Sequence, residues 1–399
     1  MKIYEFIKII GLPIIFLLFI FLLDPYSLSI KAGYLLIVAI TVFKGRTLIL
    51  NIEKDFLMIL AFSITYSLFN FFGENRGVQY LVIQATFPVF FYGLGKMLIT
   101  KTKISSKSIV TLLMFIGLMY SFTSILSIVF NLIDGGFNQF KRFIPSFWTG
   151  EEIKSTTVAS FLIYNSVIPA IIVANRKRFN SVTKIIWLVI FVVTILASFR
   201  LGSRTLLGIS LLATLASMVY IVFKQSILDN LKLGISVLLI LGIILIFVPI
   251  DANSPIFSTL GHRIKHGAGE STGTAGNRTV LWAAGLKNLF THPLGWKSHM
   301  HHHNLWLDMA KNATFIPLIF FIINNIFCYS SIKKAFKNYS EDTGLNVTFF
   351  LIFFSTFLLF FTEPVIEGNF FSIVIYCLFQ GILNGYLKNK NELSLTLSK

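Results

Sequence analysis

Charged residues and cysteines are both scarce in this sequence of 399 residues. Only 13% of the residues are Asp, Glu, Lys or Arg, whereas roughly a quarter is usual for a soluble globular protein. This scarcity excludes a soluble enzyme, a disordered chain and a nucleic-acid-binding domain, because each of these needs far more polar surface. The two cysteines, Cys328 and Cys377, lie inside apolar runs. The sequence therefore predicts neither a disulfide framework nor a thiolate metal site.

Long apolar runs take the place of the missing charge, and 55% of the residues are hydrophobic. About 20 helical residues cross the hydrocarbon of a bilayer, and lipid offers no partners to free backbone groups. We therefore expect an all-α polytopic membrane protein with about twelve transmembrane helices. The expected spans are 6–23, 29–43, 56–72, 78–98, 108–133, 156–175, 184–199, 203–223, 231–250, 305–328, 345–362 and 369–386.

The excess of positive charge follows the expected loops. The formal net charge is +17, from 34 Lys and Arg against 17 Asp and Glu, and in so apolar a chain it indicates loop charge rather than a nucleic-acid surface. With the N-terminus in the cytoplasm, 21 of the 34 basic residues lie on the inner side. Because cytoplasmic loops are enriched in Lys and Arg, both termini are expected in the cytoplasm. The loop of about 251–304, between the ninth and tenth spans, is then extracytoplasmic.

All seven histidines lie in this outer loop, between His262 and His303. Histidine is the side chain that exchanges protons near neutral pH, so the cluster indicates acid–base chemistry. The run from His299 to His303 also invites a metal interpretation. It lacks the His-Glu-x-x-His spacing and a nearby Cys or carboxylate ligand of a catalytic zinc site, so we expect no functional metal. A solvated loop with incidental histidines is the alternative.

His303 and Asn304 stand at the entrance to the tenth span. Asn is a favoured N-cap, so Asn304 predicts a helix start and places His303 beside the free N–H groups of the first turn. A helix N-terminus attracts anions. A neutral imidazole beside it can act as a general base towards a phosphate-bearing substrate.

Arg278 precedes a second predicted helix of the outer loop, over about 279–290. Asn277 or Thr279 would cap this helix, and the pair His292-Pro293 would end it. An Arg at such a place suits bidentate contact with phosphate oxygens. Contact with lipid headgroups is the alternative.

Arg200 and Arg204 lie between the seventh and eighth spans, in Ser198-Phe-Arg-Leu-Gly-Ser-Arg-Thr205. A guanidinium near the hydrocarbon is costly unless it lines a polar cavity or binds an anion. Both are therefore candidate anion-binding residues, and Arg204, near the start of a long span, is the stronger candidate. The alternative is a tight outer turn whose two Arg side chains snorkel to the interface.

These three segments, in this order, resemble the O-antigen ligase and O-antigen polymerase superfamily. The Arg pair that opens a helix is similar to its Ser/Thr-Arg-small motif. The stretch Asn277-Arg-Thr-Val-Leu-Trp-Ala-Ala-Gly-Leu-Lys-Asn-Leu-Phe-Thr-His-Pro-Leu-Gly295 is similar to its Arg-x-x-x-Trp…Pro-Leu-x-Gly stretch. His303-Asn-Leu-Trp-Leu-Asp308 is similar to its His-Asn-x-x-Leu signature. The likeness covers about 198–308 and departs at 311–317, where the family often has a Gly-containing turn.

The resemblance implies a metal-independent membrane glycosyltransferase of the C class, with one integral membrane domain over 1–399 and no cofactor. Its donor would be a glycan linked through diphosphate to undecaprenol, used outside the bacterial cytoplasmic (inner) membrane. His303 would deprotonate the acceptor hydroxyl, and His301 is the second choice for this role. The site residues that the likeness implies are the catalytic His303, Arg278 and Arg204 and the substrate-binding Arg200, Asn304, Trp282 and His301.

Within the superfamily the sequence favours a polymerase of O-antigen or capsular repeats, because the link from Gly295 to His303 is short. A ligase that transfers the glycan to the lipid A core is the alternative. Membrane lipids, a chain-length regulator and a flippase are the further partners implied, and nucleic acid is not. Two other classes stay open: a transporter of the lipid-linked saccharide, whose arginines only grip diphosphate, and a metal-dependent membrane hydrolase.

Overall fold

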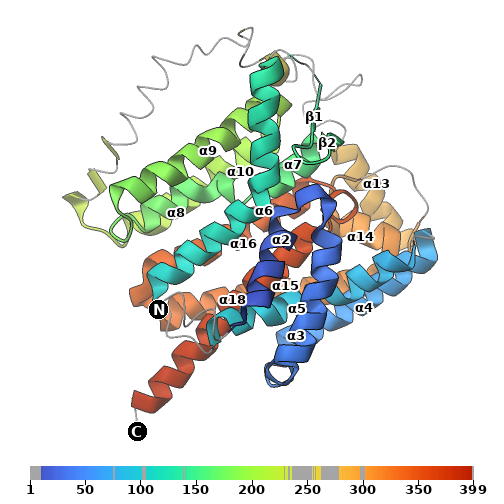
Figure 1. Ribbon diagram of the computed structural model, residues 1–399, viewed down its shortest axis with the longest axis horizontal. Coiled ribbons are helices and arrows are strands. Elements are labelled where there is room, and N and C mark those ends of the chain that lie inside the picture. Colours follow the sequence, from blue (N-terminus) through green and yellow to red (C-terminus); the bar gives the residue numbers. More distant parts are fainter. Residues whose placement is uncertain are drawn as a thin grey trace. The chain divides into compact units, whose positions relative to one another are not determined.

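The computed structural model describes residues 10–74, 77–100, 105–137, 139, 141–228, 230–231, 234–235, 254, 256, 258–261, 278–296 and 302–397. Figure 1 shows that its regular structure is almost entirely helical. The helices are α2 (Leu12–Leu23), α3 (Ser29–Ile49), α4 (Lys54–Glu74), α5 (Val78–Thr100), α6 (Ser106–Gly135), α7 (Ser155–Leu162), α8 (Ile168–Ala174), α9 (Ser181–Leu201), α10 (Arg204–Val222), α13 (Arg278–Thr291), α14 (Leu305–Ala313), α15 (Phe315–Asn338), α16 (Thr343–Thr362), α17 (Val365–Gly368) and α18 (Phe371–Leu397). The shorter elements are three 3-10 turns (Pro25–Ser27, Asn165–Val167 and Ser340–Asp342) and the strands β1 (Phe143–Pro145) and β2 (Glu152–Lys154).

The chain forms two compact units. The first combines Met1–Thr123 with Arg278–Lys399, and the second is Ser124–Asn277. Helix α6 is divided between them, because the boundary falls at Thr123 and Ser124. The N-terminal and C-terminal parts of the chain therefore pack together in one unit. This unit contains the segments with Arg278 and His303. That the two units act as one membrane domain stays a prediction.

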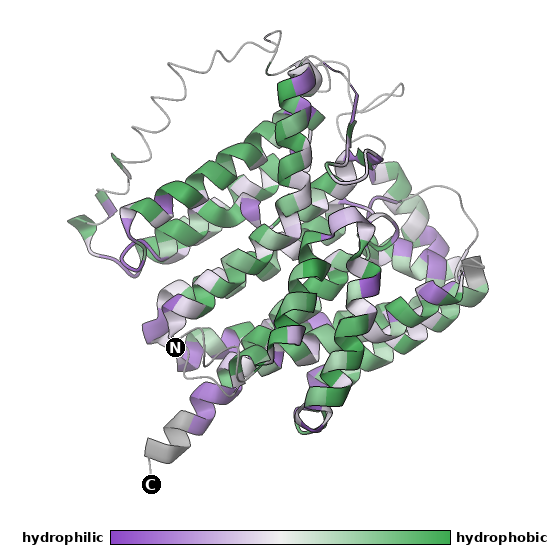
Figure 2. Cartoon of the chain, in the orientation of Figure 1, coloured by the Kyte–Doolittle hydropathy of each residue, from purple (hydrophilic) through white to green (hydrophobic). Residues whose placement is uncertain are grey.

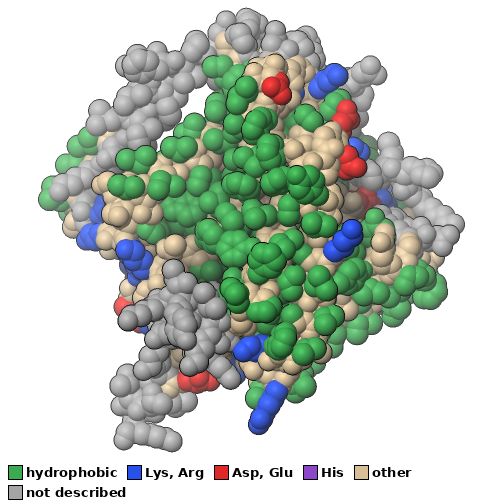
Figure 3. All heavy atoms as spheres, in the orientation of Figure 1, with side chains coloured by type: hydrophobic (Ala, Val, Ile, Leu, Met, Phe, Trp, Pro, Cys, Tyr) green, Lys and Arg blue, Asp and Glu red, His purple; other side chains and the backbone are tan. Residues whose placement is uncertain are grey.

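Many helices of the described residues are fit to span a membrane. Nine are long and apolar enough, or ten if Ser155–Leu162 and Asn165–Ala174, which meet at a bend of 54°, form one span. Figure 2 shows apolar residues along these helices, and Figure 3 shows hydrophobic side chains gathered over the face it draws, with few charged ones among them. Large apolar side chains such as Phe72 and Val42 are exposed, which is the surface that lipid covers. The chain is thus an all-α polytopic membrane protein, as predicted.

Most predicted spans coincide with helices of the structure. Eight of them overlap a single long helix each, namely α3, α4, α5, α6, α9, α10, α16 and α18. The predicted span 156–175 is the bent pair α7 and α8, and α2 covers the described part of 6–23. The predicted ninth span, 231–250, lies almost entirely outside the described residues.

The predicted tenth span, 305–328, is wrong as a single helix. Helix α14 ends at Ala313, and α15 begins after Thr314, whose φ is +73°. The backbone N–H of Phe315 bonds to the carbonyl of Pro293, 3.0 Å away, instead of continuing the helix. Pro317 falls in the first turn of α15, where its missing N–H costs nothing. The hydropathy of the sequence predicted one span here, because no polar loop separates the two helices. Helix α14 alone is too short to cross a bilayer.

Helices α5 and α18 pack backbone to backbone in the first unit. A Cβ at Gly381 would collide with the carbonyl oxygen of Tyr92, and one at Gly385 would lie 2.8 Å from that of Lys96. From the other helix, a Cβ at Gly95 would collide with α18. Small residues four apart let helices approach closely in a bilayer, where packing holds helices together.

A buried ion pair ties α5 to the link between α3 and α4 in the first unit. Lys96 is 1% exposed, pairs with Glu53 at 2.7 Å and donates to the carbonyl of Asn51 at 3.1 Å. Lys388 of α18 donates to the side chain of Asn51 at 3.0 Å. An ammonium group inside a membrane protein is costly unless it is paired in this way. That these segments lie on the inner side of the membrane stays a prediction from the distribution of Lys and Arg.

The second unit holds the chain's described β-structure and the turn with the two arginines. Strands β1 and β2 form an antiparallel hairpin in which Phe143 opposes Lys154, in a loop where the sequence predicted no strand. Gly202, whose φ is +60°, follows the last residue of α9, and Ser203 then occupies the N-cap position of α10 without a side-chain cap bond. The link between the predicted seventh and eighth spans is thus a tight turn, the geometry of the alternative interpretation of the two arginines.

Candidate functional site

Helix α13 ends in a turn that docks on the end of α14. The helix runs from Arg278 to Thr291, in agreement with the predicted 279–290. After Pro293, the φ of Gly295 is +97°, and a Cβ there would lie 2.9 Å from the carbonyl oxygen of Lys311. Only glycine accepts both this conformation and this approach. The Pro-Leu-Gly motif thus has a physical role: it fixes the end of α13 against α14.

Asn304 caps α14, as predicted. Its side-chain oxygen accepts hydrogen bonds from the backbone N–H groups of Trp306, at 3.0 Å, and Leu307, at 3.3 Å. His303, directly before the cap, is half-buried and has a φ of +51°. The left-handed region is uncommon for a residue with a side chain and is found at functional sites. His303 is therefore held at the positive end of a helix in a conformation that its own backbone does not favour.

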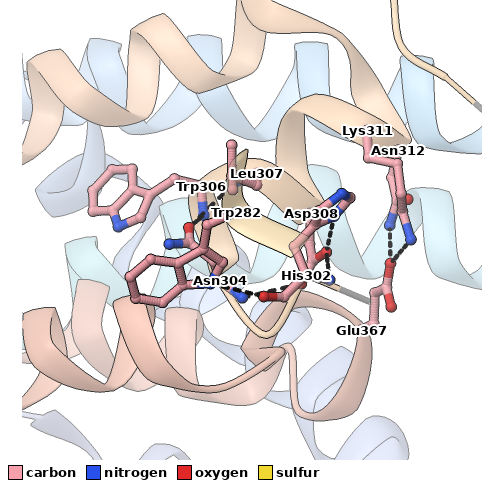
Figure 4. Close-up of polar contacts among 9 residues, drawn as sticks. All are labelled: Trp282, His302, Asn304, Trp306, Leu307, Asp308, Lys311, Asn312 and Glu367. Carbon is pink, nitrogen blue, oxygen red and sulfur yellow. Dashed lines mark hydrogen bonds and ion pairs between the residues drawn. The ribbon is translucent and has the colours of Figure 1, made fainter. Parts of the chain in front are cut away.

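Asp308 closes the turn that carries His303 (Figure 4). One carboxylate oxygen accepts from the backbone N–H of His302, at 2.8 Å, and contacts the Nδ1 of the same residue, at 2.9 Å. The other oxygen accepts from the backbone N–H of Asn304, at 3.4 Å. Both Asp308 and His302 are buried. A carboxylate without access to water needs such donors, and here they come from the residues on both sides of His303.

Trp282 joins this turn to α13. Its indole N–H donates to the carbonyl of His302, at 2.9 Å, and Figure 4 shows the indole and the turn side by side. The ring of His302 packs against Gly285, one helical turn further along α13, and meets Trp296 edge to face, with ring centroids 5.6 Å apart. Trp282 was predicted to contact substrate. The structure gives it a hydrogen bond inside the protein and leaves it half-buried.

Two carboxylates of the segment between α16 and α18 pair with cations of the site. Glu363 is buried and lies 3.7 Å from the guanidinium of Arg278. Glu367 pairs with Lys311 at 2.7 Å and accepts from Asn312 at 2.7 Å. No sequence motif pointed to this segment. The available signal was two acidic residues in the short link between two predicted spans, where a buried carboxylate needs a partner.

An apolar cavity of about 700 Å³ lies beside α13 and α14. Leu286 and Leu289 of α13 line one wall, and Trp306 and Leu307 of α14 line another. The remaining walls come from α15, α16 and α18. Its volume falls in the range of roughly 300–1,000 Å³ of ligand sites, and its walls suit a hydrocarbon chain.

Arg200 is buried in the second unit and is bound by the protein itself. Its guanidinium donates to the side chain of Asn131 at 2.9 Å, to the carbonyl of Lys141 at 2.7 Å and to the side chain of Gln139 at 2.5 Å. These contacts favour a structural role, in which Arg200 ties the end of α9 to α6 and to the segment before the hairpin. Arg204 is the first residue of α10 and is half-buried.

Comparison with known proteins does not decide the family. No family model matches the chain, and no curated protein matches it. The resemblance of residues 198–308 to the O-antigen ligase and polymerase superfamily therefore stays a hypothesis.

The structure brings some predicted site residues together and leaves others apart. Arg278, Trp282, His303 and Asn304 share the first unit, whereas Arg200 and Arg204 belong to the second. His301 and the alternative cap Asn277 lie outside the described residues. Thr279 is wrong as a cap of α13, because it lies inside that helix. Neither sequence motif indicated that His302 and Asp308 would pair.

The arrangement combines a histidine with cations beside an apolar cavity. His303 precedes a capped helix start, where partial positive charge favours an anionic ligand. Arg278 adds a full positive charge and can bind phosphate oxygens in a bidentate manner. A half-buried imidazole at this place can accept a proton from a hydroxyl. The site therefore suits transfer to a hydroxyl with departure of an anionic leaving group.

Proposed function

We propose that this protein is a polysaccharide polymerase. It transfers a glycan from undecaprenyl diphosphate to a hydroxyl of another lipid-linked repeat unit, outside the cytoplasmic membrane. The observation that carries the proposal is the bond between Trp282 and the carbonyl of His302, 2.9 Å long. It joins the helix that begins at Arg278 to the turn that presents His303. A cation for the leaving diphosphate and a base for the hydroxyl thus belong to one assembly.

In the proposed reaction, an acceptor hydroxyl attacks the anomeric carbon of the donor sugar. A carbon–oxygen bond forms as the bond from the anomeric carbon to the diphosphate oxygen breaks, and the diphosphate keeps the electron pair. His303 accepts the hydroxyl proton, and Arg278 stabilises the charge that grows on the diphosphate. Groups of each kind typically contribute on the order of 10²–10⁴ in rate. Arg204, in the second unit, stays a separate candidate for anion binding.

The apolar cavity supports a lipid-linked donor over a soluble sugar nucleotide. It is bounded by α13 and α14, the two helices that also carry Arg278 and the cap of the His303 turn. A polyprenyl chain in the cavity would leave its diphosphate near the polar residues at the start of α14. Burial of such a chain contributes about 0.8 kcal/mol per CH₂ group.

The proposed topology has about twelve spans, both termini in the cytoplasm and the site outside. The contacts of the first unit fit this alternation of spans. Three segments on the proposed outer side, around Arg278, Asp308 and Glu363, lie together. At the other end of the unit, Lys96 and Lys388 on the proposed inner side share contacts with residues 51–53.

Complementation of a polymer-deficient strain tests the proposal. The variants are His303→Ala and Arg278→Ala, and Lys287→Ala is the matched control because Lys287 is an exposed cation of the same helix. We expect the control to restore long polymer and the two site variants to leave short, lipid-linked repeats. Restoration of long polymer by both site variants at normal expression would show that the mechanism is wrong.

The acceptor distinguishes a polymerase from a ligase. Purified protein is given the lipid-linked repeats that accumulate in the deletion strain, with or without lipid A core. We expect elongation of the repeats without any core. Transfer that depends strictly on the core would make the protein a ligase.

A further inference from the structure

We infer that Asp308 is a positioning residue for the proposed base, His303, and that it acts on transfer only through the backbone of the turn 302–304. The inference rests on the proposed function. The resemblance assigns no role to Asp308, and the coupling between Asp308 and His303 can be measured.

The first observation is the backbone conformation of His303. A φ of +51° lies in the left-handed region, which is unfavourable for a residue with a side chain. A conformation of this kind persists only where the surroundings fix it. Asp308 provides this support on both sides of His303, since it accepts from the N–H of His302 at 2.8 Å and from the N–H of Asn304 at 3.4 Å.

The second observation is that the described side-chain contacts of Asp308 are made within the turn 302–304. Asp308 is 0% exposed, and it also holds the Nδ1 of His302 at 2.9 Å. The described contacts of Asp308 therefore run to its own turn and its own helix and not to the surface. A role in transfer can reach the substrate only through the residue that the turn presents, which is His303.

The third observation is that the same turn sets the place of the proposed cation. Trp282 bonds to the carbonyl of His302 from α13, one helical turn after Arg278. A release of the turn would change the position of His303 relative to Arg278. A misplacement of about 1 Å at a reacting group can cost on the order of 10² in rate.

A double-mutant cycle tests the inference on the full-length protein in membranes of the deletion strain. Initial rates of transfer are measured on the lipid-linked saccharides of that strain, at limiting and at saturating donor, for Asp308→Asn, His303→Ala and the double variant. We expect Asp308→Asn to lower the saturated rate about 10- to 100-fold, with little change in the donor concentration for half-saturation. In the His303→Ala background the same substitution should lower the rate less than about threefold, because the residue that it positions is gone.

Asn312→Ala is the matched control. Asn312 is buried one turn after Asp308 on α14, and its contact runs to Glu367 at 2.7 Å. Asn312→Ala should lower the transfer rate by the same factor in the wild-type and in the His303→Ala backgrounds. An equal cost of Asp308→Asn in both backgrounds would overturn the inference. Wild-type rates for His303→Ala would instead show that the proposed function is wrong, and the inference would fall with it.

A second variant and a second measurement guard against misfolding. Trp282→Phe keeps an aromatic side chain but removes the indole N–H that donates to His302. Its loss of transfer rate should be smaller than that of Asp308→Asn and should also vanish in the His303→Ala background. Reaction with diethyl pyrocarbonate, followed by mass spectrometry, needs no activity. Asp308→Asn should raise the rate of modification at His303 severalfold and leave the exposed His292 unchanged. An unchanged rate at His303 would contradict the positioning role.

Discussion

Gly285 of α13 lies directly against the imidazole of His302: a Cβ at this position would be 2.7 Å from the ring carbon Cδ2 and 3.1 Å from Nε2. On its other side the ring is held by Asp308, at 2.9 Å. The helix that begins at Arg278 and the turn that carries His303 therefore meet without room for a methyl group.

Gly285→Ala is expected to reduce transfer at least about tenfold. In a helix interior, replacement of Gly by Ala usually stabilises by about 1 kcal/mol, but here the methyl group must displace the ring of His302. The loss of packing should offset the gain in helix propensity, so the melting temperature in detergent should not rise. Gly208→Ala is the control, because a Cβ there meets nothing within 4 Å and should preserve activity and stability.

Gly381→Ala is expected to destabilise the first unit. The added methyl group would meet the carbonyl oxygen of Tyr92, a backbone atom that cannot rotate away. Overpacking of this kind costs about 1–3 kcal/mol, and thermal unfolding in detergent measures it. Gly45→Ala, with nothing within 4 Å of its Cβ, should be tolerated. Equal stability of both variants would contradict the close packing of α5 on α18.

Arg200→Met should destabilise the protein more than Arg204→Met does. Removal of the buried guanidinium takes one donor each from the side-chain oxygens of Asn131 and Gln139 and from the carbonyl of Lys141, and each buried group left unsatisfied costs about 1–3 kcal/mol. Arg204 stands at a helix start, so its replacement should lower transfer with little effect on unfolding. Loss of transfer by a fully stable Arg200→Met would instead favour the predicted contact with substrate.

The pair Lys311 and Glu367 should tolerate joint replacement better than single replacement. Its two charges are 2.7 Å apart with side chains 5% and 8% exposed, and removal of one partner leaves the other buried and unpaired. Breaking such a pair costs about 3–5 kcal/mol, whereas apolar replacement of both partners is often neutral. We therefore expect Glu367→Leu to unfold at a lower temperature than Lys311→Met/Glu367→Leu. Glu341→Gln, in an exposed pair with Lys390, should change little.

Filling the apolar cavity should weaken use of a long-chain donor. Ile326 lines the cavity and is exposed, so Ile326→Trp is expected to fill part of it. We expect a higher KM for the undecaprenyl donor and a smaller effect on a short-prenyl analogue. Ile319→Trp, on the same helix at a position outside the cavity lining, is the control. Equal effects on both donors would show that the cavity does not hold the lipid chain.

The sequence by itself determined the membrane architecture of this protein. Apolar runs of bilayer length leave few alternatives to spanning helices, because lipid offers no partners to an open backbone. Local sequence rules also predicted the helix ends that depend on a single residue. Asn304 caps α14, and Pro293 follows the last turn of α13.

Only the tertiary structure decided how the polar residues are used. Hydropathy predicted α14 and α15 as one helix. The break at Thr314 depends on the hydrogen bond from Phe315 to Pro293, which belongs to a different segment of the sequence. The bond from Trp282 to His302 and the ion pair of Arg278 with Glu363 join segments 20 and 85 residues apart. Neither hydropathy nor periodicity in the sequence predicts such contacts. Which polar groups pair depends on which of them the fold buries side by side. Two of the candidate residues named from the sequence, Arg278 and His303, thereby belong to segments that meet at the buried pair His302 and Asp308.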